Sequence, residues 1–266
     1  AKFVLEPGSG DGEQLSCFLK KDCNVTGIEP SEILANKARE NGINTKIGFF
    51  DFKSINQESF ELYDICLCSY TFDHSLDPIE FLKCANKCLK KNGILGIEVH
   101  NASEISNRAE YCLLEHEHTI YLCKDSITVL LESLGFEILE VNPIQESKKR
   151  ANSLIVVAKK IKYVENISLA IFKERKSSFE NFNNLQDNIK CFNEKIDNFV
   201  YSKKNSIIGY GAGGRGVMTL SQMHSYHFFK ALLDKNFDNR NVFTPKTHIP
   251  VVGPKSWKNF NQNNVL

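Results

Sequence analysis

The segment "KFVLEPGSGDG", residues 2–12, joins an apolar run to a turn that contains Gly8, Gly10 and Gly12. An apolar run of this length that leads into glycines is typical of a buried strand followed by a tight turn. Glycine permits positive φ and lets the backbone approach a ligand closely. The segment therefore predicts a strand, a glycine turn and then a helix, which is the start of a nucleotide-binding α/β unit.

Outward from this turn, short apolar runs alternate with amphipathic segments over the first 160 residues. The expected strands after the first are 24–29, 45–50, 63–70 and 93–99. The expected helices between them include 31–42 and 78–93, and Gly93 is expected to be the C-cap of the second. Strands that alternate with helices predict parallel pairing and a doubly wound sheet.

The order of elements changes near residue 125. A helix is expected over 125–134, followed by strands over 136–141 and 153–160 that are joined by a polar turn. Two strands joined without a helix form an antiparallel hairpin. An α/β Rossmann-like sheet that ends in such a hairpin resembles the class I methyltransferases, and we assign residues 1–160 to this domain.

The rest of the chain predicts a connector and a second domain. Residues 161–203 are expected to form a helical connector, because its apolar residues have helical spacing, namely Leu185, Ile189, Phe192, Ile196 and Phe199. A second, smaller Rossmann-like α/β domain is expected over 204–266, with strands at 206–210 and 228–234. The non-Met start inside a strand and the ending "NNVL", which resembles the beginning of a strand, suggest a piece of a longer protein.

Composition limits the possible partners and the compartment. The chain has 266 residues, 33 basic and 32 acidic, and a net charge of +1, which gives no electrostatic argument for nucleic acid or an anionic membrane. No apolar run of about 18 residues is present to span a bilayer. The nine cysteines show no disulfide-like framework, which favours a reducing, cytoplasmic location.

Acidic residues follow the next two expected strands, and they point to the cofactor. Glu29 ends the second strand, at the offset where an acid meets ribose hydroxyls, and Asp51 ends the third, where it could accept from an adenine amino group. NAD is the rival ligand, but E-x-G-x-G-x-G resembles the S-adenosylmethionine motif more than G-x-G-x-x-G. The predicted cofactor residues are Glu6, Gly8, Ser9, Gly10, Asp11, Glu29, Pro30, Ser31, Asp51, Phe52, Ser69 and Tyr70.

A second glycine turn, "GYGAGGRGVMTL" (209–220), also follows an expected strand and opens a helix. Backbone amides at a helix N-terminus suit a phosphate, and Arg215 adds a positive charge beside them. A glycine turn that serves only packing is the alternative. The predicted substrate residues are Tyr210, Gly211, Gly213, Arg215, Asp234 and, past the fifth strand, His100.

The segment "LLEHEHTIY" (113–121) places Glu115, His116, Glu117 and His118 in consecutive positions. On an extended strand the two histidines would share a face, but no third metal ligand is obvious, and we predict no metal here. A structural polar cluster remains an alternative. Proton transfer is favoured, because a neutral imidazole is a suitable base near neutral pH. His118 is then the expected base, and Glu117 its partner or a second candidate.

Several motifs together resemble the sugar C-methyltransferases that act on nucleotide-linked 4-keto-deoxysugars. They are "EPGSGDG", "GIEPS", "FDHSLDPIEFL", "EHEHTIY", "GYGAGGRG" and "LLDKN…FTPKTHIPVVGP". The resemblance implies S-adenosylmethionine in the first domain, a nucleotide-sugar held with help from the second, and a cysteine-rich zinc-binding segment before the first glycine turn, which the present residues do not include. The family pattern Tyr-His-Glu-His implies acid–base roles for Glu117 and His118, whereas Glu115 stands at the tyrosine position.

The function predicted is an S-adenosylmethionine-dependent methyltransferase that acts on carbon of a nucleotide-linked keto-sugar through an enolate. Two alternatives stay open. One is an O-methyltransferase on a sugar or a small polar metabolite, and the other is an inactive subunit that binds nucleotide-sugar or S-adenosylmethionine. The replacement of the tyrosine by Glu115 is the feature that keeps both alternatives open. His74 is expected to be a residue of the cofactor loop.

Overall fold

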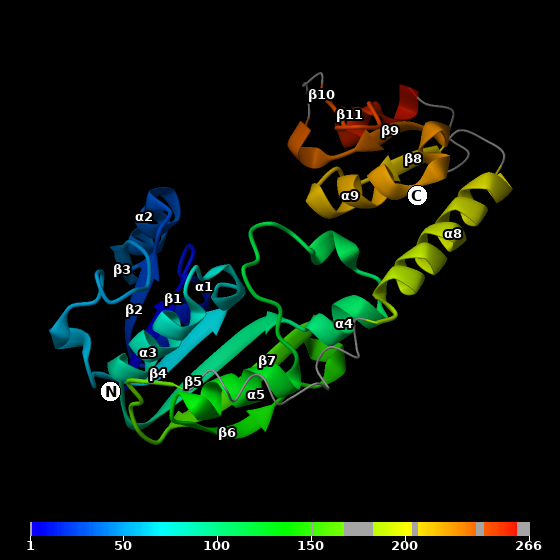
Figure 1. Cartoon of the computed structure of the whole chain (residues 1–266). Coiled ribbons are helices and arrows are strands. Elements are labelled where there is room, and N and C mark those ends of the chain that lie inside the picture. The colour runs from blue at the N-terminus through cyan, green and yellow to red at the C-terminus, as the bar shows by residue number, and fades with distance from the viewer. Residues whose placement is uncertain (1, 151, 168–182, 204–206, 238–241, 260–266) are drawn as a thin grey trace. The chain divides into compact units, whose positions relative to one another are not determined.

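The computed structural model describes residues 2–150, 152–167, 183–203, 207–237 and 242–259. The chain forms two compact units (Figure 1). The first comprises Ala1–Ile105 and His116–Asn181, and the second comprises Ser106–Glu115 and Phe182–Leu266. The unit boundary therefore falls between Glu115 and His116, inside the acid–histidine segment. No helix in the described part of the chain is both long and apolar enough to cross a membrane.

The first unit is built on a seven-stranded sheet with the strand order β3-β2-β1-β4-β5-β7-β6. Its strands are β1 (Phe3–Pro7), β2 (Asn24–Glu29), β3 (Asn44–Ile47), β4 (Tyr63–Ser69), β5 (Leu89–His100), β6 (Phe136–Val141) and β7 (Ser153–Lys160). The first five run parallel, and β7 pairs antiparallel with both β5 and β6. The predicted doubly wound sheet with a terminal hairpin is confirmed.

Four helices of this unit lie close to the predicted segments: α1 (Glu13–Leu19), α2 (Glu32–Glu40), α3 (Pro78–Cys88) and α5 (Lys124–Ser133). Helix α4 (Ala102–Asn107) was not predicted, and its last two residues fall in the second unit. Side-chain caps fix two of the starts, since Ser31 accepts from the N–H of Leu34 and Asp77 accepts from the N–H of Glu80. The predicted C-cap at Gly93 is wrong. Helix α3 ends at Cys88, and Gly93 lies within β5, where Asn92 supplies the positive φ of the bend.

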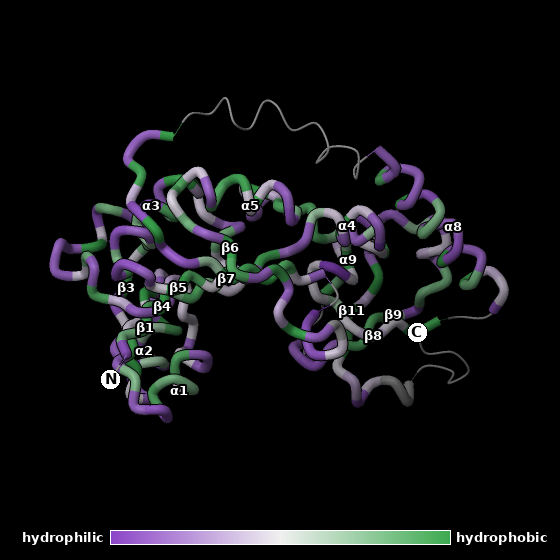
Figure 2. The backbone as a smooth tube through the Cα atoms, turned by 90° about the horizontal axis from the view of Figure 1, so that it is seen from below, coloured by the Kyte–Doolittle hydropathy of each residue, from purple (hydrophilic) through white to green (hydrophobic). Residues whose placement is uncertain are grey.

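The main core lies between the sheet and its helices. Leu5, Cys66, Leu95, Ile97 and Val156 are at most 1% exposed and form the strand side of this core. Figure 2 shows hydrophobic colouring concentrated along these strands and hydrophilic colouring on the surrounding loops. Because β1 has neighbours on both sides that follow it in the chain, the β1–β4 boundary is where the strand order reverses, and the crevice at the carboxyl ends of such strands is where open α/β sheets bind ligands.

The second unit contains a four-stranded sheet with the order β10-β11-β9-β8. Its elements are α8 (Leu185–Lys203), β8 (Ile207–Tyr210), α9 (Gly214–Gln222), β9 (Phe229–Leu233), β10 (Val242–Phe243) and β11 (Pro250–Val252). Strands β8, β9 and β11 are parallel, as expected for a second α/β unit. The expected strand at 263–266 lies outside the described residues.

The predicted connector over 161–203 lies partly outside the described residues, and helix α8 is its described helix. It groups with the second unit, because Val200 is fully buried in that unit's core and Ile196 packs against it. Buried Asp197 adds a polar anchor, since its Oδ1 accepts from the N–H of Ser225 at 2.9 Å and its Oδ2 from the N–H of His224 at 3.1 Å. The alternation of hydrophilic and hydrophobic colour along α8 in Figure 2 reflects this one-sided packing.

Candidate functional site

The first glycine turn follows β1 directly, and its three glycines all have positive φ: 69° at Gly8, 54° at Gly10 and 81° at Gly12. A Cβ at Gly8 would collide with the side chain of Thr71, and one at Gly12 would lie 2.7 Å from Ile43. At Gly10 an added Cβ would meet nothing within 4 Å. The open space above Gly10 is therefore available to a ligand that approaches the backbone.

Glu29 ties the end of β2 to this turn. Its Oε2 accepts from the N–H of Gly10 at 2.9 Å, and its Oε1 accepts from the N–H of Ser31 at 2.8 Å. The residue is 6% exposed. Each carboxylate oxygen keeps a further lone pair, so Glu29 can hold the turn and still accept from the hydroxyls of a ribose.

Two buried polar side chains beside the turn have oxygens without a hydrogen-bond partner in the described structure. They are Glu6, whose Oε2 is unpaired, and Ser9, whose Oγ is unpaired. Burial raises the pKa of Glu6 to about 8. Buried polar atoms normally find a partner, so Glu6 Oε2 and Ser9 Oγ are atoms to which a polar ligand at the turn can hydrogen-bond.

A cavity of 370 Å³ opens at the carboxyl ends of these strands. Gly8, Pro30 and Asp51 line it, as the sequence predicts for cofactor residues. Asp51 does not end a strand, because β3 stops at Ile47, and its Oδ1 accepts from the N–H groups of Lys53 and Ser54. The remaining lining residues are Ile28, Gly48, Phe49, Phe50, Thr71, His74, Ser75, Leu76, Asp77, Glu80 and Phe81.

The other predicted cofactor residues are placed differently. Asp11 forms a surface ion pair with Lys37, whose hydrogen bond and charge lower the pKa of Asp11. The N–H of Phe52 donates to Glu80 at 3.4 Å, and the Oγ of Ser69 donates to Gln14. None of these three predicted residues lines the cavity.

Tyr70 turns toward the β7 side of the sheet. Its hydroxyl is hydrogen-bonded to Ser153, and the guanidinium of Arg150 lies 4.6 Å from the centre of its ring. The backbone of Tyr70 has a φ of 49°, which redirects the chain after β4. This geometry directs its side chain toward β7, and Tyr70 is absent from the lining of the 370 Å³ cavity.

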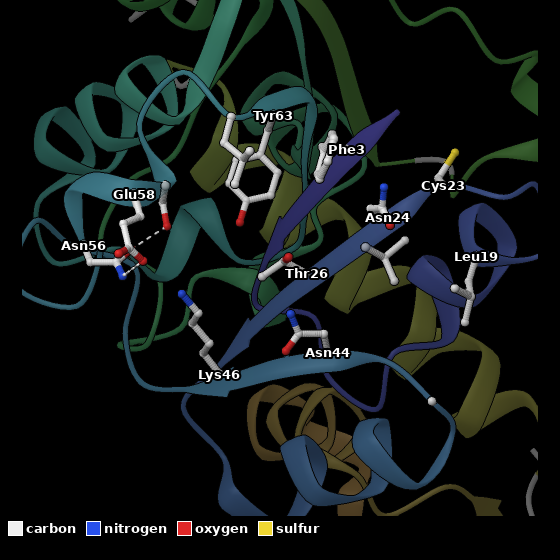
Figure 3. Close-up of a pocket in the computed structure, with 14 residues that line it drawn as sticks. Phe3, Leu19, Cys23, Asn24, Thr26, Asn44, Lys46, Asn56, Glu58 and Tyr63 are labelled. Atoms are coloured by element: carbon white, nitrogen blue, oxygen red, sulfur yellow. Dashed lines mark hydrogen bonds between the residues drawn. The ribbon is translucent and has the colours of Figure 1, made fainter. Parts of the chain in front are cut away.

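A second cavity, of 490 Å³, lies at the opposite ends of the same strands (Figure 3). Phe3, Asn24 and Asn44, which begin β1, β2 and β3, line it together with Tyr63 and Lys46. Ligands of open parallel sheets bind at the carboxyl ends of the strands, so we do not assign the cofactor to this cavity although it is the larger one.

The acid–histidine segment is a turn and not the predicted strand. His116 and Glu117 lie in the turn and are exposed, so His116 and His118 do not share a strand face. The segment docks on the loop after β4, which contains the short 3-10 helix Phe72–His74. The N–H of Thr119 donates to the carbonyl of Asp73 at 2.8 Å, and His74 Nδ1 lies 3.1 Å from the carbonyl of Glu117.

This docking buries His118 in a polar cluster. Its side chain is 5% exposed, and its ring centre lies 4.7 Å from that of His74 and 5.0 Å from that of His100. His74 in turn lines the 370 Å³ cavity. The predicted base therefore contacts a cavity residue but is not itself among the residues that line the cavity.

Asp73 is the carboxylate of this cluster, and the sequence analysis missed it. Its Oδ2 lies 2.9 Å from His100 Nδ1 and 4.0 Å from His118 Nε2. Burial alone would raise the pKa of Asp73, but the hydrogen bond from His100 and the charges of His100, His74 and His118 outweigh burial and lower that pKa. An ionised Asp73 only accepts hydrogen bonds, so His100 Nδ1 carries the donated proton.

The ligating atoms of Asp73, His100 and His118 lie within 4.8 Å of one another, a spacing that a divalent metal ion could also use. Two observations favour a hydrogen-bonded network instead. The 2.9 Å separation of His100 from Asp73 is that of a hydrogen bond. A metal-bound imidazole donates its second N–H to an acceptor, whereas His100 Nε2 has no partner in the described structure.

The second glycine turn repeats the design of the first within its own unit. Gly211 has a φ of 97°, and Asp234, just after β9, accepts from the N–H of Ala212 at 2.9 Å. The backbone N–H groups of Asn236 and Ala212 lower the pKa of Asp234. Asp234 thus clamps this turn as Glu29 clamps the first.

A shallow cavity of 290 Å³ lies beside the second turn, and Tyr210, Gly211 and Arg215 line it. An added Cβ at Gly213 or Gly214 would meet nothing within 4 Å. Packing therefore does not require small residues at these positions, which leaves close approach of a ligand as a reason for them.

Comparison with known proteins identifies both parts of the chain. A family model described as a methyltransferase domain matches residues 2–141, and one described as a C-methyltransferase C-terminal domain matches residues 153–266. The C-methyltransferase NovU of Streptomyces niveus is 22% identical over 267 residues, which cover 95% of this chain and 63% of NovU. An uncharacterized methyltransferase of Bacillus pumilus is 39% identical over 76 residues, which cover 29% of this chain and 35% of that protein. The chain thus spans less than two thirds of the length of these relatives.

Solved structures support the fold of the first unit. An S-adenosylmethionine-dependent methyltransferase from Mesorhizobium loti superposes with a TM-score of 0.50 at 15% identity, covering 60% of this chain and 91% of that one. A structure of the Haloferax volcanii Trm112 methyltransferase activator with its methyltransferase gives a TM-score of 0.51 at 14% identity, covering 60% and 83%. The chain therefore belongs to the methyltransferase-domain family, with S-adenosylmethionine as its cofactor, and it carries the C-terminal domain of the C-methyltransferases.

Proposed function

We propose that the protein transfers a methyl group to a carbon atom next to the ketone of a nucleotide-linked keto-sugar, with His118 as the base. The family assignment supports methyl transfer, and the C-methyltransferase C-terminal domain supports carbon as the acceptor. The observation that carries the proposal is the buried imidazole of His118, which lies beside the anionic Asp73 and in ring contact with the cavity residue His74.

The residues around the first glycine turn fit S-adenosylmethionine. Glu29 offers its free lone pairs to the ribose hydroxyls, and the unpaired carboxyl of Glu6 is a suitable partner for an ammonium group. Phe49, Leu76 and Phe81 give the cavity an apolar lining that suits a purine ring. When bound, S-adenosylmethionine supplies a methyl group that is attached to a positively charged sulfur.

A carbon atom needs a base before it can accept this methyl group. His118 removes a proton from the carbon next to the ketone, and the electron pair left behind is shared with the ketone oxygen as an enolate. The proton stays on the imidazole, where the charge of Asp73 stabilises it. General base catalysis of this kind contributes roughly 10²–10⁴-fold to the rate.

The second glycine turn is the proposed site for the diphosphate of the substrate. The backbone amides at the start of α9 and the guanidinium of Arg215 offer donors for phosphate oxygens. The open space above Gly213 and Gly214 allows a phosphate to approach the backbone. The nucleotide-sugar itself is inferred from this turn and from the resemblance to the sugar C-methyltransferases.

Exchange of substrate protons with solvent tests the proposal. A panel of nucleotide-linked 4-keto-deoxysugars is incubated in D₂O with the protein and S-adenosylhomocysteine, and deuterium at the carbon next to the ketone is measured by NMR. We expect rapid exchange with the wild type and a loss of about 10²-fold or more in His118→Ala. His116→Ala is the matched control, because His116 is exposed in the same turn. A parallel incubation replaces S-adenosylhomocysteine with S-adenosylmethionine. Methyl transfer to a hydroxyl there, without proton exchange, would show an O-methyltransferase. Neither exchange nor methyl transfer on any sugar would contradict the proposal.

A further inference from the structure

One carboxylate oxygen serves two histidines in the buried cluster. Asp73 Oδ2 lies 2.9 Å from His100 Nδ1 and 4.0 Å from His118 Nε2. The Asp73 and His118 side chains are 5% exposed, and the His100 side chain is 9% exposed. Solvent therefore screens these charges weakly, and the position of one proton in the cluster changes the proton affinity of the others.

Groups from three elements of the described structure lie against the His118 ring. Asp73 and His74 belong to the loop after β4, His100 ends β5, and Tyr121, whose ring centre lies 5.8 Å away, follows His118 in the chain. Among these, Asp73 is the anion and the others are imidazoles or a phenol. Asp73 therefore favours a proton on His118, whereas a proton on His100 or His74 opposes it.

His100 competes for the oxygen that His118 would use. It holds Oδ2 at hydrogen-bond distance, while His118 remains 1.1 Å farther away, by the difference between 4.0 Å and 2.9 Å. The second oxygen of Asp73, Oδ1, is buried and has no hydrogen-bond partner in the described structure. The carboxylate can therefore shift toward His118 when that ring becomes charged, without breaking a bond at Oδ1.

We propose that Asp73 and His100 are positioning residues that set the proton affinity of His118, with Asp73 raising it and His100 lowering it. The inference rests on the proposed role of His118 as the base. Asp73 stabilises the imidazolium that forms when His118 takes a substrate proton. His100 keeps that stabilisation partial, so that the imidazolium can release the proton again before the next turnover.

Variants with opposite expected effects test this tuning. Asp73→Asn keeps the shape of the side chain and removes its charge, and His100→Leu removes the competing donor. His100→Asn is the matched control, because its amide N–H can replace Nδ1–H toward Asp73. The titration midpoint of the His118 ring is followed by NMR in protein labelled at the histidine rings, without substrate. The acidic limb of the pH profile of proton exchange gives a second reading.

We expect Asp73→Asn to lower the midpoint of His118 by about 1 unit or more, the usual effect of losing an opposite charge within about 4–6 Å. His100→Leu should raise the midpoint, and His100→Asn should lie between His100→Leu and the wild type. If Asp73 and His100 had only a structural role, Asp73→Asn and His100→Leu would shift the midpoint of His118 in the same direction or not at all. Either result would overturn the inference. Binding of S-adenosylhomocysteine and the near-UV circular dichroism spectrum report whether each variant folds.

Two further results distinguish this inference from a metal site and from the proposed function. A midpoint that moves when a chelator is added, or stoichiometric Zn²⁺ binding that Asp73→Asn abolishes, would reassign the cluster to a metal and overturn the tuning. Opposite shifts in the NMR titration without methyl transfer to any keto-sugar would uphold the tuning and contradict only the proposed function.

Discussion

Glu29→Gln should weaken both the first glycine turn and the binding of the cofactor. Glu29 accepts one backbone N–H on each oxygen, from Gly10 at 2.9 Å and from Ser31 at 2.8 Å. The glutamine side chain keeps one acceptor and turns an NH₂ group toward the other N–H, so one charge-assisted hydrogen bond is lost. Such a bond contributes about 1.5–3 kcal/mol. For a domain of 150–250 residues this corresponds to a Tm lower by roughly 3–12 °C.

The effect on the cofactor is measured separately from the effect on folding. Titration calorimetry with S-adenosylhomocysteine is done well below the Tm of the variant. It should show a binding free energy weaker by about 1–3 kcal/mol, which corresponds to a Kd about 5- to 150-fold higher. Glu32→Gln is the matched control, because Glu32 is exposed in the first turn of α2, and it should change neither quantity. A lower Tm with an unchanged Kd would reduce Glu29 to a clamp for the turn and refute its role as a cofactor ligand.

Three further predictions follow from the two turns. Gly8→Ala should destabilise the fold through its collision with Thr71, whereas Gly10→Ala should fold with only the strain of positive φ and lose affinity for S-adenosylhomocysteine, as thermal unfolding and calorimetry would show. Gly214→Ala should raise the Tm, because alanine favours the first turn of α9. It should also weaken the binding of the nucleotide-sugar without changing the binding of the methyl donor. An unchanged affinity for the nucleotide-sugar would mean that this turn serves only packing. Glu6 has a pKa raised to about 8, so its ionisation costs the ligand-free fold stability as pH rises from about 4.5 to 8. Glu6→Gln should therefore gain stability over the wild type across that window, by roughly 3–5 kcal/mol above pH 8 in denaturant titrations, and a constant difference at all pH values would contradict the burial of an ionisable Glu6.

Local sequence patterns were sufficient for the sheet and for the first glycine turn with the acid that holds it. The strand before Gly8 and the acid at the end of β2 are short-range features, because a strand, its turn and its terminal residue are adjacent in the chain. The positions of the turn glycines could also be predicted from the sequence, but their different roles could not. In the structure, packing requires small residues at Gly8 and Gly12, whereas the space above Gly10 is open.

The histidine cluster could not be predicted from any one segment. Asp73, His100 and His118 come from the loop after β4, the end of β5 and the turn after the 3-10 helix Tyr111–Leu113. They meet because β4 and β5 are parallel neighbours, whose carboxyl ends lie at one edge of the sheet, and because Thr119 docks on Asp73. The alternation of acid and histidine suggested a strand, but the hydrogen bonds to the loop after β4 hold the segment as a turn.

The identity of the methylated atom tests the central claim most directly. The wild type is incubated with a nucleotide-linked 4-keto-deoxysugar and S-adenosylmethionine that carries a ¹³C-labelled methyl group, and the product is analysed by two-dimensional NMR. We predict that the wild type gives a product with the methyl group bonded to the carbon next to the ketone. At early times, His118→Ala should give at most about one hundredth of the wild-type yield of this product. A methyl group bonded to oxygen, or equal yields from the two proteins, would contradict base-assisted methylation of carbon by His118.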